Sequence, residues 1–166
     1  MQSRLDFTKA APSAYRAMAA LESYVKNSSR LEPSLLELVR MRTSQINGCA
    51  YCLDMHSKGA RAAGESEQRL YALDAWRETP FFTPFFTDRE RAALAWTEAI
   101  TLISSSHAPD EIYEEARQRF TEEELVKLTL GIVAINGWNR LLIGFRAIPG
   151  THQPSKSQSL ASGESR

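Results

Sequence analysis

The chain has 166 residues, of which 43% are hydrophobic, and its 20 Lys and Arg residues balance 20 Asp and Glu residues. This length and composition favour one domain with a sizeable core. The zero net charge excludes a whole-protein field that would attract nucleic acid or an anionic membrane, and no apolar run is long enough to span a bilayer. Residues 1–11 lack the apolar stretch of a secretory signal, so we expect a cytoplasmic location.

Apolar residues recur at helical spacing along most of the chain, and no segment alternates convincingly with the period of a strand. The sequence therefore predicts an all-α fold of about six to seven helices. In chain order, we expect helices at about 13–26, 33–47, 49–63, 66–75, 87–104, 109–119 and 122–146.

Local signals mark several of these helix boundaries. Pro33 suits a first helical position, and the Asn47-Gly48 pair tolerates the left-handed backbone that ends a helix. The second and third predicted helices therefore form a hairpin across this pair. Two capping boxes mark the starts of later helices, Thr87 with Glu90 and Thr121 with Glu124.

Two segments lie outside the predicted helices. Residues 80–84 are a predicted loop, and the four phenylalanines in and after it must be buried somewhere: Phe81, Phe82, Phe85 and Phe86. Together with the apolar last helix, these rings are more apolar surface than a small monomer usually exposes, so we expect a homo-oligomer. Residues 151–166 are rich in Ser, Gln and Gly, which predicts a disordered tail after a domain of residues 1–150.

The chemistry-bearing residues cluster around the predicted hairpin. Cys49 and Cys52 are three residues apart, and His56 follows four residues later, so all three share one helix face. A tight turn at 47–48 brings Glu37 of the preceding helix alongside, where it could orient His56 or serve as a distal base. The helix N-terminus favours a thiolate at Cys49, whereas the neighbouring imidazole favours Cys52.

Two thiols at this spacing suit the reduction of a peroxide. A thiolate attacks one peroxide oxygen, and the sulfenic acid that results condenses with the second thiol to a disulfide. Other interpretations are a chance pair of packed cysteines, a zinc site made by the same four side chains, a general thiol–disulfide oxidoreductase, and a redox-sensing oligomer. Because no second pair of metal-ligating residues follows, we expect no bound metal.

The spacing of Glu37, Cys49, Cys52 and His56 resembles the signature of alkylhydroperoxidase D (AhpD)-like proteins in the carboxymuconolactone decarboxylase superfamily. The whole stretch from Glu37 to His56 is similar to that family, as is the stretch from Ala134 to Arg140. The likeness extends from about Leu5 to Pro149. One departure is Tyr51, which stands where the family's well-studied peroxidase has a further histidine beside its second cysteine.

This resemblance implies an all-α subunit that assembles into trimers or hexamers and reduces a hydroperoxide substrate. It implies that Cys52 is the peroxidatic thiol and Cys49 the resolving thiol, while His56 relays the proton and Glu37 is the distal base. It also implies that no cofactor or prosthetic group is needed, and that an external dithiol reductant resets the disulfide.

Overall fold

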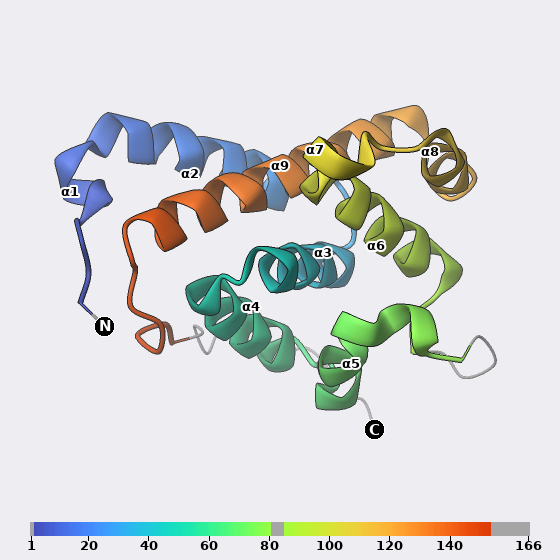
Figure 1. The fold of residues 1–166 in the computed structure, drawn as a ribbon, viewed down its shortest axis with the longest axis horizontal. Coiled ribbons are helices and arrows are strands. Elements are labelled where there is room, and N and C mark those ends of the chain that lie inside the picture. The colour runs from blue at the N-terminus through green and yellow to red at the C-terminus, as the bar shows by residue number, and fades with distance from the viewer. Residues whose placement is uncertain (1, 81–84, 154–166) are drawn as a thin grey trace, which may run out of the picture.

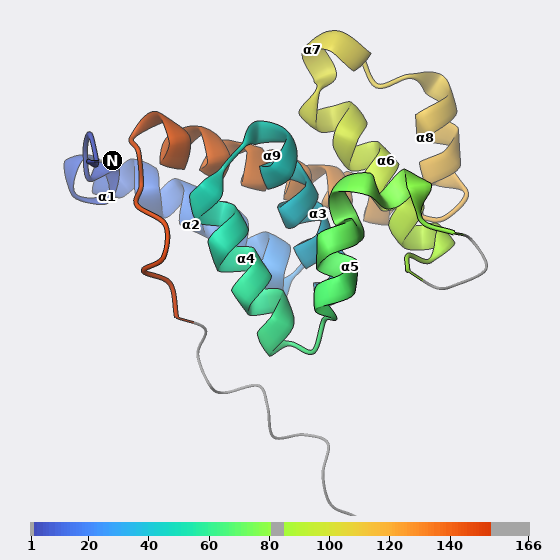
Figure 2. The same ribbon diagram turned by 60° about the horizontal axis from the view of Figure 1, so that its bottom comes forward.

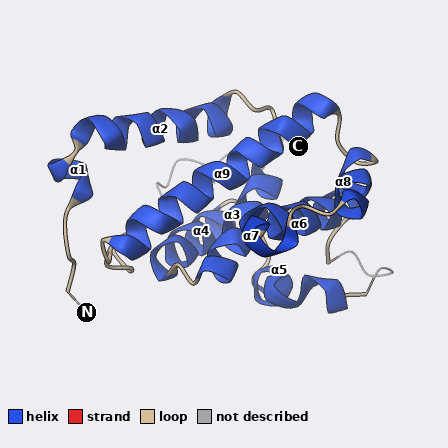
Figure 3. Ribbon diagram, turned by 45° about the horizontal axis from the view of Figure 1, so that its top comes forward, coloured by secondary structure: helices blue, strands red, loops and turns tan. Residues whose placement is uncertain are grey.

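The computed structural model describes residues 2–80 and 85–153, and within these ranges the chain is helical, with no strand (Figures 1 and 3). The all-α prediction is confirmed. The described residues form nine α-helices and one 3₁₀ helix: α1 (Phe7–Ala10), α2 (Pro12–Asn27), α3 (Pro33–Asn47), α4 (Ala50–Ala62), α5 (Glu67–Ala72), η1 (Leu73–Glu78), α6 (Asp88–Thr101), α7 (Ile103–Ser106), α8 (Asp110–Arg117) and α9 (Glu122–Gly144). None of these helices is long and apolar enough to cross a membrane.

The helices outnumber those expected because short elements were missed. The four-residue helix α1 is capped by Asp6, whose carboxylate accepts hydrogen bonds from two backbone N–H groups. The helix expected at 66–75 ends early, and η1 continues it. The helix expected at 87–104 divides at Leu102 into α6 and α7, where the hydroxyls of Ser105 and Ser106 donate to backbone carbonyls and compete with regular helix geometry.

Helices α3 and α4 form the predicted hairpin. Gly48 lies between them with a φ of 68°, and its N–H donates to the carbonyls of Gln45 and Ser44. Helix α4 begins at Ala50, so Cys49 is its N-cap residue and lies just before the first turn. Figure 2 shows the turn lying beside α9, and Asn47 in the turn donates to two side chains of that helix.

Helix α3 is the centre of the fold. It packs against α4, α6 and α9, and α9 lies between α2 and α3 (Figures 1 and 3). One core cluster joins α2, α3, α6, α8 and α9 around Leu36 and Leu128, and a second lies under α5 and η1 around Leu38 and Leu73. Residues on both faces of α3 are therefore buried, which fixes the position of any functional side chain on it.

Both predicted capping boxes are present, and Pro33 is the first residue of α3 as expected. Phe86 is buried in the second core cluster and Phe85 packs against it. The remaining two phenylalanines of the predicted loop, Phe81 and Phe82, lie outside the described residues, as do residues 154–166 of the predicted tail.

We predict that Gly48→Ala destabilises the fold by about 1 kcal/mol, because an L-residue at a positive φ is strained. A Cβ there would meet no other atom within 4 Å, so the effect isolates the backbone conformation. Denaturant unfolding measures the change. The control is Gly144→Ala in α9, where a Cβ also meets nothing within 4 Å but the backbone is helical. Equal effects of the two substitutions would contradict the argument.

Candidate active site

The two cysteines lie at the N-terminus of α4 and are both free thiols. Their exposed fractions are 1% for Cys49 and 0% for Cys52. They form a small cluster with Ile135 of α9, and three half-buried side chains pack against it: Tyr51, Trp138 and Leu142. The pair is therefore enclosed by the hairpin on one side and by a mostly apolar face of α9 on the other.

The two thiols have opposite pKa shifts because they share one hydrogen bond. That bond, together with backbone N–H groups of Cys52 and Tyr51, outweighs burial and lowers the pKa of Cys49 to about 7. The same bond, with burial and the charge of Cys49, raises the pKa of Cys52 above its ordinary value. The resting anion is thus favoured on Cys49, where the free N–H groups of the helix end stabilise it.

Glu37 and His56 form a pair across the hairpin. His56 Nδ1 lies 2.8 Å from Glu37 Oε2, and Arg40 donates to Glu37 Oε1 at 2.7 Å. Arg40 is itself buried and also donates to Glu22 Oε1 on α2 at 2.5 Å. Burial by itself raises the pKa of Glu37, but the hydrogen bond and charge of His56, with the charge of Arg40, lower it overall.

This arrangement fixes the histidine tautomer. An ionised Glu37 accepts hydrogen bonds only, so Nδ1 of His56 is the donor and Nε2 of the neutral ring carries the free lone pair. His56 lies one helical turn after Cys52 on α4. Glu37 can therefore hold the His56 ring on the helix face that carries Cys52. The basic nitrogen of that ring, Nε2, has no bond to Glu37.

A buried polar network joins the cysteines to α9. Asn47 Nδ2 donates to Oδ1 of Asn136 and of Asn139, each at 2.9 Å. Asn139 Nδ2 donates to Ser44 Oγ, and the Ser44 hydroxyl donates to the carbonyl of Arg40. These bonds connect α9 with α3 directly beside the thiol pair.

No group of three or more His, Cys, Asp and Glu side chains in residues 2–80 and 85–153 has the arrangement of a metal site. The carboxylate of Glu37 instead bonds the imidazole of His56 and the guanidinium of Arg40.

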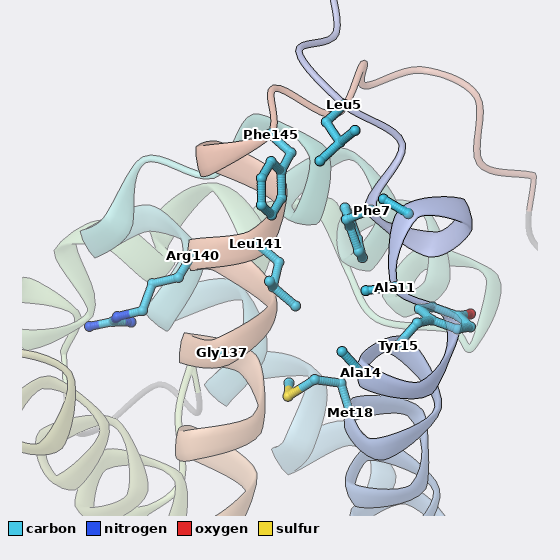
Figure 4. A pocket seen from close by; sticks show the side chains of 11 residues that line it. Leu5, Phe7, Ala11, Ala14, Tyr15, Met18, Gly137, Arg140, Leu141 and Phe145 are labelled. Atoms are coloured by element: carbon cyan, nitrogen blue, oxygen red, sulfur yellow. The ribbon is translucent and has the colours of Figure 1, made fainter.

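An apolar recess of about 460 Å³ lies between α9 and the two N-terminal helices, and none of the four predicted site residues lines it (Figure 4). The guanidinium of Arg140 points away from this recess in Figure 4 and donates to Asn136 on its own helix. The larger side chains that line the recess are Leu5, Phe7, Tyr15, Met18, Leu141 and Phe145. The recess is separate from the thiol pair.

The structure brings the predicted residues together on the hairpin, with Glu37 hydrogen-bonded to His56 and the free thiols of Cys49 and Cys52 packed in one cluster. Sequence reasoning missed the polar residues that support them. Arg40 lies one turn after Glu37, so helical spacing could have found it. Three of the missed residues pair only through tertiary contacts: Glu22, Asn47 and Asn139.

Fold and site together define an all-helical protein of the AhpD-like class, with its CxxC pair on a helical hairpin. The sequence profile of the carboxymuconolactone decarboxylase family matches residues 12–99, and the chain belongs to this family.

Its relatives agree with this assignment. The uncharacterized protein YdfG of Bacillus subtilis is 45% identical over 143 residues, which cover 86% of this chain and 94% of YdfG. A protein of unknown function from Agrobacterium tumefaciens, suggested to be the antioxidant defence protein AhpD, is 44% identical with a TM-score of 0.85 and is matched over 91% of this chain and 100% of that one. The debrominase Bmp8 shares the fold, with a TM-score of 0.75 at 21% identity, over 87% of this chain and 75% of that one.

Proposed function

We propose that this protein is a thiol-dependent peroxidase that reduces hydroperoxides through a Cys49–Cys52 disulfide cycle, with Glu37 and His56 as a proton relay. The observation that carries the proposal is the hydrogen-bonded pair of thiols at a helix N-terminus, one of them with a pKa near 7, beside an imidazole held by a carboxylate. The similar protein from Agrobacterium tumefaciens, suggested to be the antioxidant defence protein AhpD, supports an antioxidant role.

In the first step, a thiolate sulfur attacks the terminal peroxide oxygen. An S–O bond forms, the O–O bond breaks, and the leaving alkoxide takes a proton to become the alcohol. His56 accepts that proton from solvent at Nε2 and passes it to the alkoxide, while Glu37 holds the ring by its hydrogen bond to Nδ1. The sulfur is oxidised to a sulfenic acid and the peroxide is reduced.

In the second step, the other thiol attacks the sulfenic sulfur. An S–S bond forms, the S–O bond breaks, and the hydroxide leaves as water after taking the remaining thiol proton. Two electrons have then passed from the thiol pair to the peroxide. An external dithiol restores both thiols and becomes a disulfide itself. Cys49 adjoins the exposed residue Gly48, so we expect its sulfur to be the one that the reductant attacks.

We assign Cys52 as the attacking thiol and Cys49 as the resolving thiol. The anion that rests on Cys49 takes the Cys52 proton across their shared hydrogen bond, so Cys52 becomes the nucleophile without a change in the charge of the pair. The pKa shifts of the resting pair favour the reverse assignment, and trapping the sulfenic acid separates the two.

Burial of the pair favours a small oxidant. Both cysteines are almost inaccessible, so a small peroxide reaches them with less rearrangement of the structure than a large partner needs. The neighbouring side chains Tyr51, Trp138 and Leu142 are largely apolar and suit an organic substituent on the peroxide.

We also propose that the subunit forms a homo-oligomer, a trimer or a hexamer, through the outer face of α9. Val126 and Val133 on that helix are 70% and 49% exposed, and Ile143 is exposed as well. A long helix that is apolar on most sides is usually covered by another element. Because no described element of the same chain covers these residues, a second copy of the chain is the simplest partner.

Sedimentation velocity tests this interface. We expect the protein to sediment as a trimer or a hexamer, and Val126→Arg to shift it towards the monomer because a charge is then buried between copies. The control is Glu115→Arg, an exposed position on α8. A wild-type protein that sediments as a stable monomer at micromolar concentration would contradict the proposal.

Trapping of the sulfenic acid tests the catalytic cycle. We expect Cys49→Ser to react once with an organic hydroperoxide and stop as a sulfenic acid on Cys52, which dimedone labels. Cys52→Ser should show no fast reaction. Dimedone labelling of Cys49 in the Cys52→Ser protein would instead identify Cys49 as the attacking thiol.

The same stopped-flow assay tests the relay. We expect His56→Ala and Glu37→Gln to slow the first step by roughly 100-fold while the disulfide still forms, since both thiols remain. Glu115→Gln removes a carboxylate from an exposed position and should leave the rate unchanged. An unchanged rate in the two relay variants would contradict the roles of His56 and Glu37.

A further inference from the structure

Asn139 is a buried amide on the α9 face that covers the thiol pair. Its exposed fraction is 0%. It lies one turn after Ile135 and one turn before Leu142, and it follows Trp138 directly; all three of these α9 residues pack with the cysteines. A polar side chain fully buried at this point of an otherwise apolar face requires partners for each of its polar atoms.

Hydrogen bonds fix the orientation of the Asn139 amide. Asn47 Nδ2 donates to Asn139 Oδ1 at 2.9 Å, so the oxygen points towards the hairpin turn. Asn139 Nδ2 donates to Ser44 Oγ at 3.2 Å. An amide nitrogen carries two hydrogens, and this bond uses one of them. The second hydrogen remains for the neighbouring sulfur atoms.

Few other side-chain donors serve these sulfur atoms. The Ser44 hydroxyl lies beside Cys52, but its hydrogen is donated to the carbonyl of Arg40 at 2.7 Å. The hydrogen bond between the cysteines has the largest effect on both pKa values, and burial follows it; Asn139 has a smaller effect, which acts in the same direction at both sulfurs. Its hydrogen bonding lowers the pKa of Cys49 and opposes the rise in the pKa of Cys52.

We infer that Asn139 is a catalytic residue of the thiol site, because its buried amide, oriented by Asn47 and Ser44, donates its second hydrogen to the cysteine pair and stabilises the reactive thiolate. This inference deepens the proposed peroxidase function, and the description of Asn139 as catalytic rests on that function. Because Asn139 lowers the pKa at both cysteines, the same donor serves the anion whether Cys49 or Cys52 carries it.

Other ionisable groups near the pair belong to the hairpin. Tyr51 and His56 lie on α4, and Glu37 and Arg40 lie behind His56 on α3. The α9 face formed by Ile135, Asn139 and Leu142 carries no ionisable side chain. A change at Asn139 therefore alters a neutral donor and leaves the charges around the thiols in place.

A thiolate titration of the reduced protein, followed by ultraviolet absorbance without any peroxide, tests the inference. The wild-type midpoint should lie at about 7. Asn139→Ala should raise it by about one pH unit, because a donor to the anion is lost. Asn139→Asp, which keeps the acceptor for Asn47 but replaces the donor with a carboxylate, should raise it further.

Asn136→Ala is the matched control. Asn136 lies on the same helix and accepts from the same Asn47 amide, but its own amide donates to Thr101 Oγ1 and the Ile132 carbonyl, away from the sulfurs. Its loss should leave the titration midpoint unchanged. A midpoint that moves equally in the Asn136 and Asn139 variants would overturn the inference in favour of a structural role.

A second measurement needs no substitution. In nitrogen-15-labelled wild-type protein, the side-chain amide resonances of Asn139 should shift with the same midpoint as the thiolate absorbance, and those of Asn136 should not. An Asn139 amide that ignores the thiol titration would refute the inference even if the variants fail to fold. Because neither measurement uses peroxide, their outcome is independent of whether the protein turns peroxide over.

Discussion

The hydrogen bond between Cys49 and Cys52 is the interaction on which the site depends. It places one negative charge in a location that is almost fully buried, and an unpaired buried charge is strongly unfavourable. Three sets of groups stabilise this buried charge: the second thiol, the free N–H groups at the start of α4 and the amide of Asn139. A thiolate that is stable near neutral pH therefore requires the start of α4, the thiol pair and α9 to be held in fixed relative positions.

Helix α3 fixes these relative positions. It is buried on both faces, and it carries Glu37, Arg40 and Ser44 in successive turns towards α4 and α9. The carboxylate of Glu37 is held by two cationic partners, His56 when it is protonated and Arg40 always, and Arg40 is balanced by Glu22 on α2. Core packing and proton relay thus use the same helix, so a substitution that loosens α3 should affect both.

Much of this was predictable because the signals are local. The capping boxes, the proline at the start of α3 and the Asn47-Gly48 turn each act within a few residues, and the structure has all of them. The common helix face of Cys52 and His56 follows from helical spacing alone, whereas Cys49, expected in the first turn, is the N-cap residue just before it. Helices α1 and α7 are four residues each, too short for hydrophobic periodicity to mark. Glu22 on α2 and Asn139 on α9 contact α3 residues that are 18 and 95 positions away in the sequence, respectively. No local pattern predicts contacts between such distant segments.

The proposed cycle requires that a peroxide oxidises Cys49 and Cys52 to a disulfide with one another. Its most direct test is a single-turnover experiment in which reduced protein is mixed with one equivalent of an organic hydroperoxide and analysed by intact mass and peptide mapping. We expect one equivalent of alcohol, the loss of two hydrogen masses per chain and a single Cys49–Cys52 disulfide, formed at the rate of peroxide loss. Fully reduced thiols after the peroxide has been given time to react, or stable sulfinic acid in place of the disulfide, would contradict it.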